Sequence, residues 1–389
     1  MTDSFRHMSD VAMFIFGVAS AMLFYVYLGY PFLLAIIALF CRRSEQELGC
    51  CPTISVLIAA RNEQAEIGRK IEETLASDYP AENLEVVVAS DASTDRTDSI
   101  VKRCRDPRVR LVRIPKHRGK TVAQNVGVEA CRGDVIVFSD ATTVYHPKAF
   151  RYLACNYEDP TVGGVSGRYD YFDLEKASPA GFGSIAYWNY ENVIKMLQSR
   201  IHSLTGSSGC IYSVRRKLYT PLPNDACSDL VEPLCIVRQG YRVVFEGRAL
   251  AREETTKTVN EEFRMRVRVI TNGLLGILMM RELLKFWKYP WVSFQLLSHK
   301  VLRWMIPIFL VLLFLADAVL AGRPLFQFLF LLQVLFYGFA IASMLIPFHR
   351  LWKPLGIPFY FCSMNAAVLF SGLELCKGNK HATWETVRT

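Results

Sequence analysis

The stretch from Val11 to Phe40 contains no charged side chain, and it constrains the fold more than any other feature of the sequence. About 20 apolar residues cross the hydrocarbon core of a bilayer, so this stretch is long enough to span it with some tilt. A cleaved signal peptide would carry a shorter apolar region of roughly 7–15 residues. We therefore expect residues 1–50 to form a membrane anchor. The basic pair Arg42-Arg43 favours a cytoplasmic position for the middle of the chain, with the N-terminus outside.

A second apolar block follows Pro290 and predicts further membrane helices, so residues 305–389 are expected to form a C-terminal transmembrane region and tail. Four spans that start outside would leave the tail outside, whereas the basic residues of the tail favour the cytoplasm. The number of spans is therefore left open, and one segment could be re-entrant or interfacial. The candidate spans lie near Met305–Ala321, Leu325–Ile346 and Leu355–Leu375.

The segment Leu283–Trp304 interleaves basic and aromatic residues, which predicts an amphipathic helix lying in the headgroup region of the bilayer. Such a helix explains part of the net charge of +9 through anionic lipid. A nucleic-acid partner would require a basic face on a recognised binding module, and the sequence contains none. Asp317 and Glu374 lie inside or at the ends of apolar segments, and we expect both to be solvated near an interface.

The middle of the chain, residues 51–282, alternates apolar runs of strand length with segments of helical periodicity. This alternation predicts an α/β domain with a mostly parallel sheet and right-handed crossovers. In such sheets ligands bind at the carboxyl ends of the strands. The expected strands are 54–60, 84–89, 109–114 and 135–139, and the expected helices are 65–77, 95–104, 120–131, 182–198, 230–239 and 261–284.

Polar residues follow each expected strand, and their chemistry predicts a nucleoside diphosphate at this edge. Asp91 is suited to a base or ribose, and Arg118 and Lys120 are suited to phosphates beside the start of a helix. Asp140 at a strand end suits a hard divalent ion that bridges to diphosphate oxygens. The alternatives are that Asp95 only caps a helix and that Lys120 is only solvated.

Other familiar motifs fail on inspection. The first glycine of a phosphate-binding P-loop ending at Gly119-Lys120-Thr121 would fall at Ile114, and no G-x-G-x-x-G follows the first strand. Gly206-Ser207-Ser208-Gly209 does not fit the hydrolase pattern G-x-S-x-G. The 11 cysteines lack a C-x-x-C pair and the seven histidines lack ligand spacing, so we expect reduced thiols and no zinc site.

Five ordered motifs resemble family 2 inverting glycosyltransferases of the membrane-embedded kind, a group that includes cellulose, chitin and hyaluronan synthases. The resemblance implies a GT-A nucleotide-diphospho-sugar domain with transmembrane helices at both ends. It covers nearly the whole middle region and extends to the membrane layout. The motifs are ISVLIAARNE (54–63), VVVASDASTDRT (86–97), HRGKTVAQNVGV (117–128), VIVFSDATTVYHP (135–147) and SDLVEPLCIVRQGYRVVF (228–245).

The resemblance implies a UDP-sugar as donor and assigns roles to particular residues. One set would hold the uracil and ribose, and Lys120 would lie near the nucleotide. Three arginines would form a basic segment that steadies the leaving diphosphate. The uracil and ribose set is Ala60, Arg61, Glu63 and Asp91, and the arginines are Arg264, Arg266 and Arg268.

The resemblance also implies a divalent cation, Mg²⁺ or Mn²⁺, placed on the diphosphate by a D-x-D motif that begins at Asp140. Thr142 replaces the second acid of that motif, so this motif supplies only one carboxylate. Asp229 matches the general base, and sugar transfer with inversion requires one such base for the acceptor hydroxyl. Asp229 as a helix cap, and Glu232 as a cap or a substitute base, remain alternatives.

We therefore expect a hexosyl- or N-acetylhexosaminyltransferase in the plasma (inner) membrane, with a cytoplasmic catalytic domain and a polysaccharide or lipid-linked acceptor. The Q-x-x-R-W segment of processive synthases is absent, which leaves processivity open. The alternatives are non-processive transfer to a lipid phosphate and an inactive nucleotide-binding subunit. Tyr187 and Trp188 are either an acceptor platform or core residues.

Overall fold

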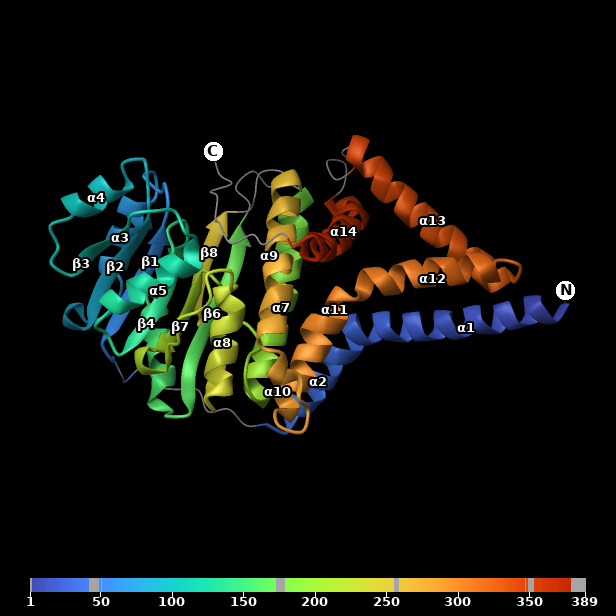
Figure 1. Ribbon diagram of the computed structural model, residues 1–389, viewed down its shortest axis with the longest axis horizontal. Helices are drawn as coiled ribbons and strands as arrows, with labels where there is room; N and C mark the ends of the chain where they lie inside the picture. Colours follow the sequence, from blue (N-terminus) through green and yellow to red (C-terminus); the bar gives the residue numbers. More distant parts are fainter. Residues whose placement is uncertain are drawn as a thin grey trace.

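The computed structural model describes residues 2–41, 49, 51–172, 179–254, 259–346, 348 and 353–378. The basic pair Arg42-Arg43 and the tail after residue 378 lie outside the described residues. Two parts are visible in Figure 1: a sheet domain and a group of long helices that extends away from it toward the N-terminus.

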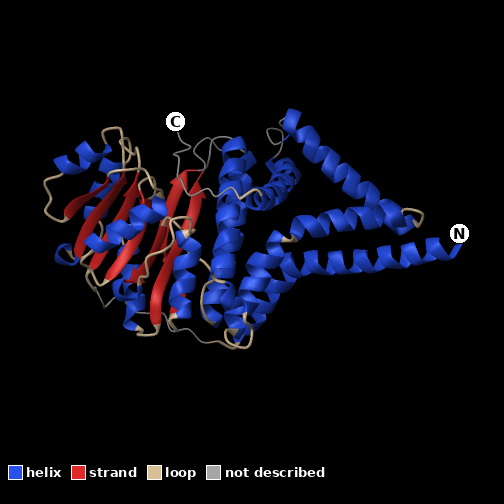
Figure 2. Cartoon of the chain, in the orientation of Figure 1, coloured by secondary structure: helices blue, strands red, loops and turns tan. Residues whose placement is uncertain are grey.

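An eight-stranded mixed sheet forms the centre of the domain, in the order β3-β2-β1-β4-β7-β6-β8-β5 (Figure 2). The first four strands of this order are parallel to one another, as the sequence predicts, and β7 then runs antiparallel to both β4 and β6. The strands are β1 (Ile54–Ala60), β2 (Leu84–Asp91), β3 (Val109–Ile114), β4 (Val135–Asp140), β5 (Val144–Tyr145), β6 (Val162–Phe172), β7 (Ile211–Arg215) and β8 (Arg242–Glu254).

Two hydrophobic cores lie on opposite faces of the sheet. Every residue of β1 is buried, because alternate side chains face alternate cores. Leu57 packs in the core on the side of α5 and α8, whereas Val56 packs in the core on the side of α3 and α6. The helices of this domain are α3 (Ile67–Leu75), α4 (Thr97–Arg103), α5 (Lys120–Ala130), α6 (Ala149–Cys155), α7 (Pro179–Ile201), α8 (Ser228–Arg238) and α9 (Val259–Met279).

Long apolar helices form the second part of the molecule. Three described helical segments are long and apolar enough to cross a membrane, or four if a bent helix pair is one span. In Figure 1, α1 and α12 lie side by side, while α14 is viewed nearly end-on and packs against α9. The helices are α1 (Thr2–Phe24), a π-helical turn (Tyr25–Gly29), α2 (Tyr30–Leu39), α12 (Ile306–Leu320), α13 (Pro324–Leu345) and α14 (Ile357–Cys376).

The expected amphipathic helix over Leu283–Trp304 begins later, at Pro290, and continues through a π-helical turn to Trp304. Its position in the headgroup region stays a prediction. The segment contains the end of a 3-10 turn (Arg281–Leu284), α10 (Pro290–Leu296), a π-helical turn (Leu297–Val301) and α11 (Leu302–Trp304). Three of its basic residues bond to the buried carboxylate of Glu191 on α7, a partner that the sequence analysis did not foresee. These residues are His299, Lys300 and Arg303.

The expectation that Asp317 is solvated near an interface is also wrong. Its side chain is buried between helices, where Gln333 of α13 donates a hydrogen bond to its Oδ2 atom. A polar partner on the facing helix replaces water, so the residue does not require an aqueous surface. Glu374 is half-buried near the end of α14 and lies 3.8 Å from the Lys377 ammonium.

Candidate active site

The carboxyl ends of β1, β2 and β4 meet at one edge of the sheet, as expected. Ala60 pairs with Ser90, and Ala59 pairs with Asp140, so the loops after these strands are neighbours. Two non-glycine residues in these loops have positive φ angles, Asn62 at 53° and Ala92 at 52°. Backbone strain of this kind is concentrated at functional sites, which supports a binding role for this edge.

Ala60 and Glu63 are both buried beside this edge. The methyl group of Ala60 lies in the hydrophobic core, so any contact with a ligand would come from its backbone. The backbone N–H of Glu63 donates to Thr97 Oγ1 at 2.8 Å, which ties the loop after β1 to the start of α4. Asp95 accepts a hydrogen bond from the backbone N–H of Thr97 at 2.9 Å, but it lies one residue before the N-cap position of α4, which Arg96 occupies.

Asp91 is fully buried and organises the loop before α5. Its carboxylate accepts hydrogen bonds from the backbone N–H groups of Arg118 at 2.9 Å and Gly119 at 2.8 Å, and it lies 2.7 Å from His117 Nδ1. Gly119 has a φ of 97°, a conformation that favours glycine. The Arg61 guanidinium donates to the Asp91 carbonyl at 3.0 Å. Direct binding of a ribose or uracil by Asp91 stays a prediction.

Lys120, the first residue of α5, bonds to Asp140 at the end of β4. Its Nζ atom donates to Asp140 Oδ1 and lies 3.5 Å from the carbonyl oxygen of Gly209. Burial alone would lower the pKa of Lys120, but Asp140, and Asp229 more weakly, raise the pKa above its usual value. The lysine is therefore cationic at neutral pH and is not merely solvated.

The Thr142 hydroxyl donates to Glu253 Oε1 on β8 at 2.6 Å, and Glu253 also accepts a hydrogen bond from Tyr169. A metal-ligand role for Thr142 stays a prediction. Glu253 thus brings a second carboxylate to this part of the site from a distant strand. The sequence analysis missed it because 111 residues separate Glu253 from Thr142. Among the described residues, no three His, Cys, Asp or Glu side chains form a ready metal cluster.

Asp229 lies in the first turn of α8, because this helix starts at Ser228 and not at residue 230 as expected. Cys227 Sγ donates to Asp229 Oδ1 at 2.9 Å, and the Ser207 N–H donates to the Asp229 carbonyl at 2.7 Å. A Cβ atom added at Gly209 would lie 2.8 Å from Asp229 Oδ2, so only glycine leaves the carboxylate its present position. The loop 203–209 therefore joins Asp229 to the pair of Lys120 and Asp140.

Glu232 does not cap α8, which corrects one of the alternatives above. It is fully buried, and neither of its carboxylate oxygens has a hydrogen-bond partner in the described part of the chain. Burial raises the pKa of this carboxyl to about 8. The residue is therefore protonated at neutral pH.

The three arginines of α9 do not share one surface. Residues two positions apart on a helix are separated by about 200°, so Arg266 faces away from Arg264 and Arg268. Arg264 is exposed, whereas Arg266 is buried and pairs with Glu262 at 2.8 Å. Burial lowers the pKa of Arg268, and Cys227 and Asp140 act in the opposite direction, which places Arg268 electrostatically near the site.

Trp188 and Tyr187, adjacent residues of α7, make different kinds of contact. Trp188 packs edge-on against Tyr169 at 4.7 Å between ring centroids, as a core residue does. Tyr187 instead lies against the guanidinium groups of Arg266 at 4.7 Å and Arg303 at 4.8 Å.

Lys195, which the sequence analysis did not single out, is buried and donates to Ser208 Oγ at 2.9 Å. Burial lowers the pKa of Lys195 to about 8, and Glu191 partly opposes this shift.

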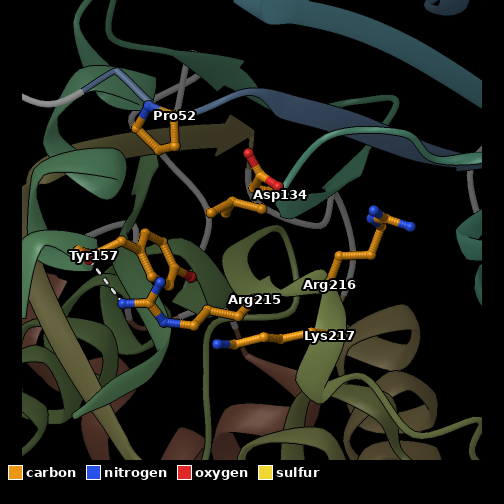
Figure 3. A pocket seen from close by; sticks show the side chains of 7 residues that line it. Pro52, Asp134, Tyr157, Arg215, Arg216 and Lys217 are labelled. Atoms are coloured by element: carbon orange, nitrogen blue, oxygen red, sulfur yellow. Dashed lines mark hydrogen bonds between the residues drawn. The ribbon is translucent and has the colours of Figure 1, made fainter. Parts of the chain in front are cut away.

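A cavity of about 340 Å³ lies at the opposite, amino edge of the sheet (Figure 3). Its lining includes Pro52, Asp134, Arg215 and Lys217, and the Arg215 guanidinium donates to the Tyr157 carbonyl at 2.7 Å. It contains none of the predicted site residues. Another cavity, of about 370 Å³, lies where the sheet domain meets the apolar helices.

Residues 55–220 match the family model for glycosyl transferase family 2. The chain carries a family 2 glycosyltransferase domain. The match covers the loops after β1, β2 and β4, and it also includes Lys120 and Gly209. Asp229 and the arginines of α9 lie beyond the matched range.

Named relatives of the glycosyltransferase domain come from several bacteria. The probable glycosyltransferase YdaM of Bacillus subtilis is 26% identical over 237 residues, which cover 58% of this chain and 56% of the relative. The succinoglycan biosynthesis protein ExoO of Rhizobium meliloti is 37% identical over 102 residues, 26% of this chain and 29% of the relative. The chain thus spans about half or less of the length of these curated relatives.

A solved structure extends the fold comparison to almost the whole molecule. A mannosyltransferase from Pyrobaculum calidifontis, in complex with GDP-Man and Mn²⁺, superposes with a TM-score of 0.69 at 20% identity. The match covers 94% of this chain and 100% of the other. The prediction of a GT-A type α/β domain accompanied by apolar helices is therefore confirmed.

Proposed function

We propose that the protein is a membrane-bound glycosyltransferase that moves a sugar from a UDP-sugar to a polysaccharide acceptor with inversion. The observation that carries this proposal is the arrangement around Gly209. Lys120 bonds to Asp140 and lies 3.5 Å from the Gly209 carbonyl, and Asp229 faces the Cα atom of the same glycine. A carboxylate near a cation–carboxylate pair, at the ligand-binding edge of an α/β sheet, suits transfer from a nucleotide sugar.

In this proposal Asp229 accepts the proton of the acceptor hydroxyl as its oxygen attacks C1 of the sugar. The bond between C1 and the diphosphate oxygen breaks, and UDP leaves with the bonding electrons. Attack from the side opposite the leaving group inverts the configuration at C1. Lys120 and Arg268 supply positive charge near the developing charge of the diphosphate.

We propose that Asp140 and Glu253 hold a divalent cation, Mg²⁺ or Mn²⁺, with the Thr142 hydroxyl beside them. Hard cations of this kind bind through one or two carboxylates plus substrate phosphates and waters, which fits this set of oxygen donors. When bound, the cation supplies Lewis-acid stabilisation of the leaving diphosphate. The Mn²⁺ in the mannosyltransferase complex is in keeping with this choice.

The proposed setting is the plasma (inner) membrane, with the catalytic domain in the cytoplasm. The apolar helices support membrane attachment. The name of the succinoglycan biosynthesis relative supports a polysaccharide acceptor. The GDP-Man of the mannosyltransferase complex makes guanosine sugars a necessary comparison in any donor test.

The test is UDP release by the purified full chain in detergent, from a panel of UDP-sugars and GDP-mannose, with Mg²⁺, Mn²⁺ or EDTA. Asp229→Asn is expected to lower turnover by roughly 100-fold or more while UDP binding is retained. Asp134→Asn, an exposed acid at the opposite edge of the sheet, serves as the matched control. Nucleotide binding without release for every donor and acceptor would contradict the proposal and favour an inactive subunit.

A further inference from the structure

Lys70 on α3 is a buried lysine that the proposed reaction does not use. Its side chain is 1% exposed, and lysine is almost never buried to this extent unless it is paired with an acid. The Lys70 ammonium bonds instead to Thr143, and no carboxylate of the described residues accepts a hydrogen bond from it. Burial lowers the pKa of Lys70 to about 7, and Cys210, Glu73 and Asp140 partly oppose this shift.

The contacts of Lys70 fix the direction of a hydrogen-bond chain that leads to Asp140. The Lys70 Nζ atom donates to the Thr143 carbonyl at 2.8 Å and to Thr143 Oγ1 at 3.2 Å. An ammonium group can only donate, so the Thr143 hydroxyl accepts this bond and keeps its single proton for another partner. That hydroxyl donates to the Asp140 carbonyl at 3.1 Å. The ammonium therefore holds both ends of the turn 140–143, which contains Asp140 and Thr142.

The same ammonium is also connected to the loop of Gly209, on the other side of the site. It lies 3.4 Å from the centroid of the Tyr145 ring on β5, and such a cation–π contact is strongest when the cation is desolvated. The Tyr145 hydroxyl donates to the Cys210 carbonyl at 2.6 Å. Cys210 directly follows Gly209, the residue around which the proposed site is arranged. Lys70 thus supports the turn 140–143 and the loop of Gly209 together.

The charge of Lys70 is not what the packing of the core requires. An ammonium group without an acid partner costs free energy to bury, whereas an apolar side chain of similar volume does not. Methionine has a similar length and no branch, so it fills the same space at Lys70 without this cost. Proteins break the rules of stable packing mainly at functional sites. The buried charge therefore indicates a role in the neighbouring site.

We propose that Lys70 is a positioning residue of the sugar-transfer site, whose ammonium fixes the turn 140–143 so that the Asp140 carboxylate is aimed at the divalent cation. The inference rests on the proposed function, because it assigns a support to the cation site of that function. Lys70 contacts neither the donor nor the cation. It acts through Thr143, as the hydrogen-bond partners behind metal ligands do when they orient those ligands.

The experiment measures Mn²⁺ binding to the full chain in detergent, with UDP present and no sugar donor, by the loss of the electron paramagnetic resonance signal of free Mn²⁺. Lys70→Met is expected to weaken Mn²⁺ binding by roughly tenfold or more, because the chain that orients Asp140 is lost. The melting midpoint of this variant is expected to equal or exceed that of the wild type. Its UDP binding in EDTA, measured by calorimetry, is expected to be unchanged.

Further variants separate positioning from a structural effect. Thr143→Val removes the relaying hydroxyl and should weaken Mn²⁺ binding by a smaller factor, because the bond from Lys70 to the carbonyl of residue 143 remains. The double variant Lys70→Met/Thr143→Val should bind Mn²⁺ no more weakly than Lys70→Met alone. Arg69→Met, the matched control, removes the adjacent cation of α3, which pairs with Glu66 and Glu73 at the surface, and should change nothing.

Four results would overturn the inference. Wild-type Mn²⁺ affinity in folded Lys70→Met would make Lys70 a core residue only, and so would an unfolded Lys70→Met protein together with wild-type affinity in Thr143→Val. Additive losses in the double variant would show that Lys70 does not act through Thr143. A wild type that binds no Mn²⁺ would remove the cation that the turn is proposed to serve. Because no sugar donor is present, a wild type that binds Mn²⁺ and UDP but transfers no sugar contradicts only the proposed function.

Discussion

Replacing Glu232 by glutamine is expected to remove a pH dependence from the stability of this protein. The carboxyl is fully buried on α8, and neither oxygen has a hydrogen-bond partner within the described residues. Burial raises its pKa from 4.5 to about 8. The native state therefore keeps a proton that the unfolded chain loses at a lower pH.

The sign and size of the effect follow from this difference. Below pH 4.5 both states are protonated, and above about pH 8 both are ionised. Between these values the free energy of unfolding falls by about 1.4 kcal/mol for each pH unit, because the unfolded state binds fewer protons. Over the whole interval the loss is roughly 5 kcal/mol. The glutamine variant has no proton to lose and lacks this contribution.

The assay is thermal unfolding of the full chain in detergent at several pH values from 5 to 8. The difference between the wild-type and Glu232→Gln midpoints isolates this residue, since other titrating groups act equally on both proteins. Between pH 5 and pH 7 the wild type should lose roughly 3 °C relative to the variant. Glu129→Gln, an exposed acid on α5, should follow the wild type. Parallel wild-type and Glu232→Gln curves would refute the reasoning.

Three further predictions concern the site and its support. Gly209→Ala places a Cβ 2.8 Å from Asp229 Oδ2, so turnover should fall by about 100-fold while UDP binding, measured by calorimetry, persists. Glu253→Gln should raise the Mn²⁺ concentration needed for half-maximal turnover several-fold, and an unchanged titration would remove Glu253 from the proposed metal site. Gly127→Ala pushes a methyl group to 2.4 Å from a side-chain atom of Leu57 and should destabilise the protein by about 1–3 kcal/mol, seen as a lower melting midpoint.

The parallel half of the sheet was predictable from the sequence because strands that are buried on both faces produce a local sequence pattern. Strands such as Ile54–Ala60 are continuous apolar runs, and polar residues such as Asp91 and Asp140 mark their ends. The position of β7, between β4 and β6 and antiparallel to both, produces no comparable local pattern. Which strand pairs with which is decided by contacts between distant segments, and local periodicity does not report these contacts.

The same limit explains the partners that the sequence analysis missed. More than 100 residues separate Glu191 from its partners His299, Lys300 and Arg303, and Glu253 bonds to Thr142 from another strand. The composition of Leu283–Trp304 fits a lipid surface as well as it fits internal ion pairs, because basic and aromatic side chains are stable in either environment. Only the carboxylate of Glu191 distinguishes the two, and it belongs to a different helix.

The burial of Glu191 also determines how the chain can be divided. A chain that ends before Pro290 would lack His299, Lys300 and Arg303, so this carboxylate would lose two cationic partners and the imidazole of His299. An uncompensated buried charge is strongly destabilising. The sheet is formed from earlier residues, but the core on the side of α5 and α8 includes Val292 and Leu296 of α10. We therefore expect that the glycosyltransferase domain does not fold independently, and that expression without the C-terminal helices yields insoluble protein.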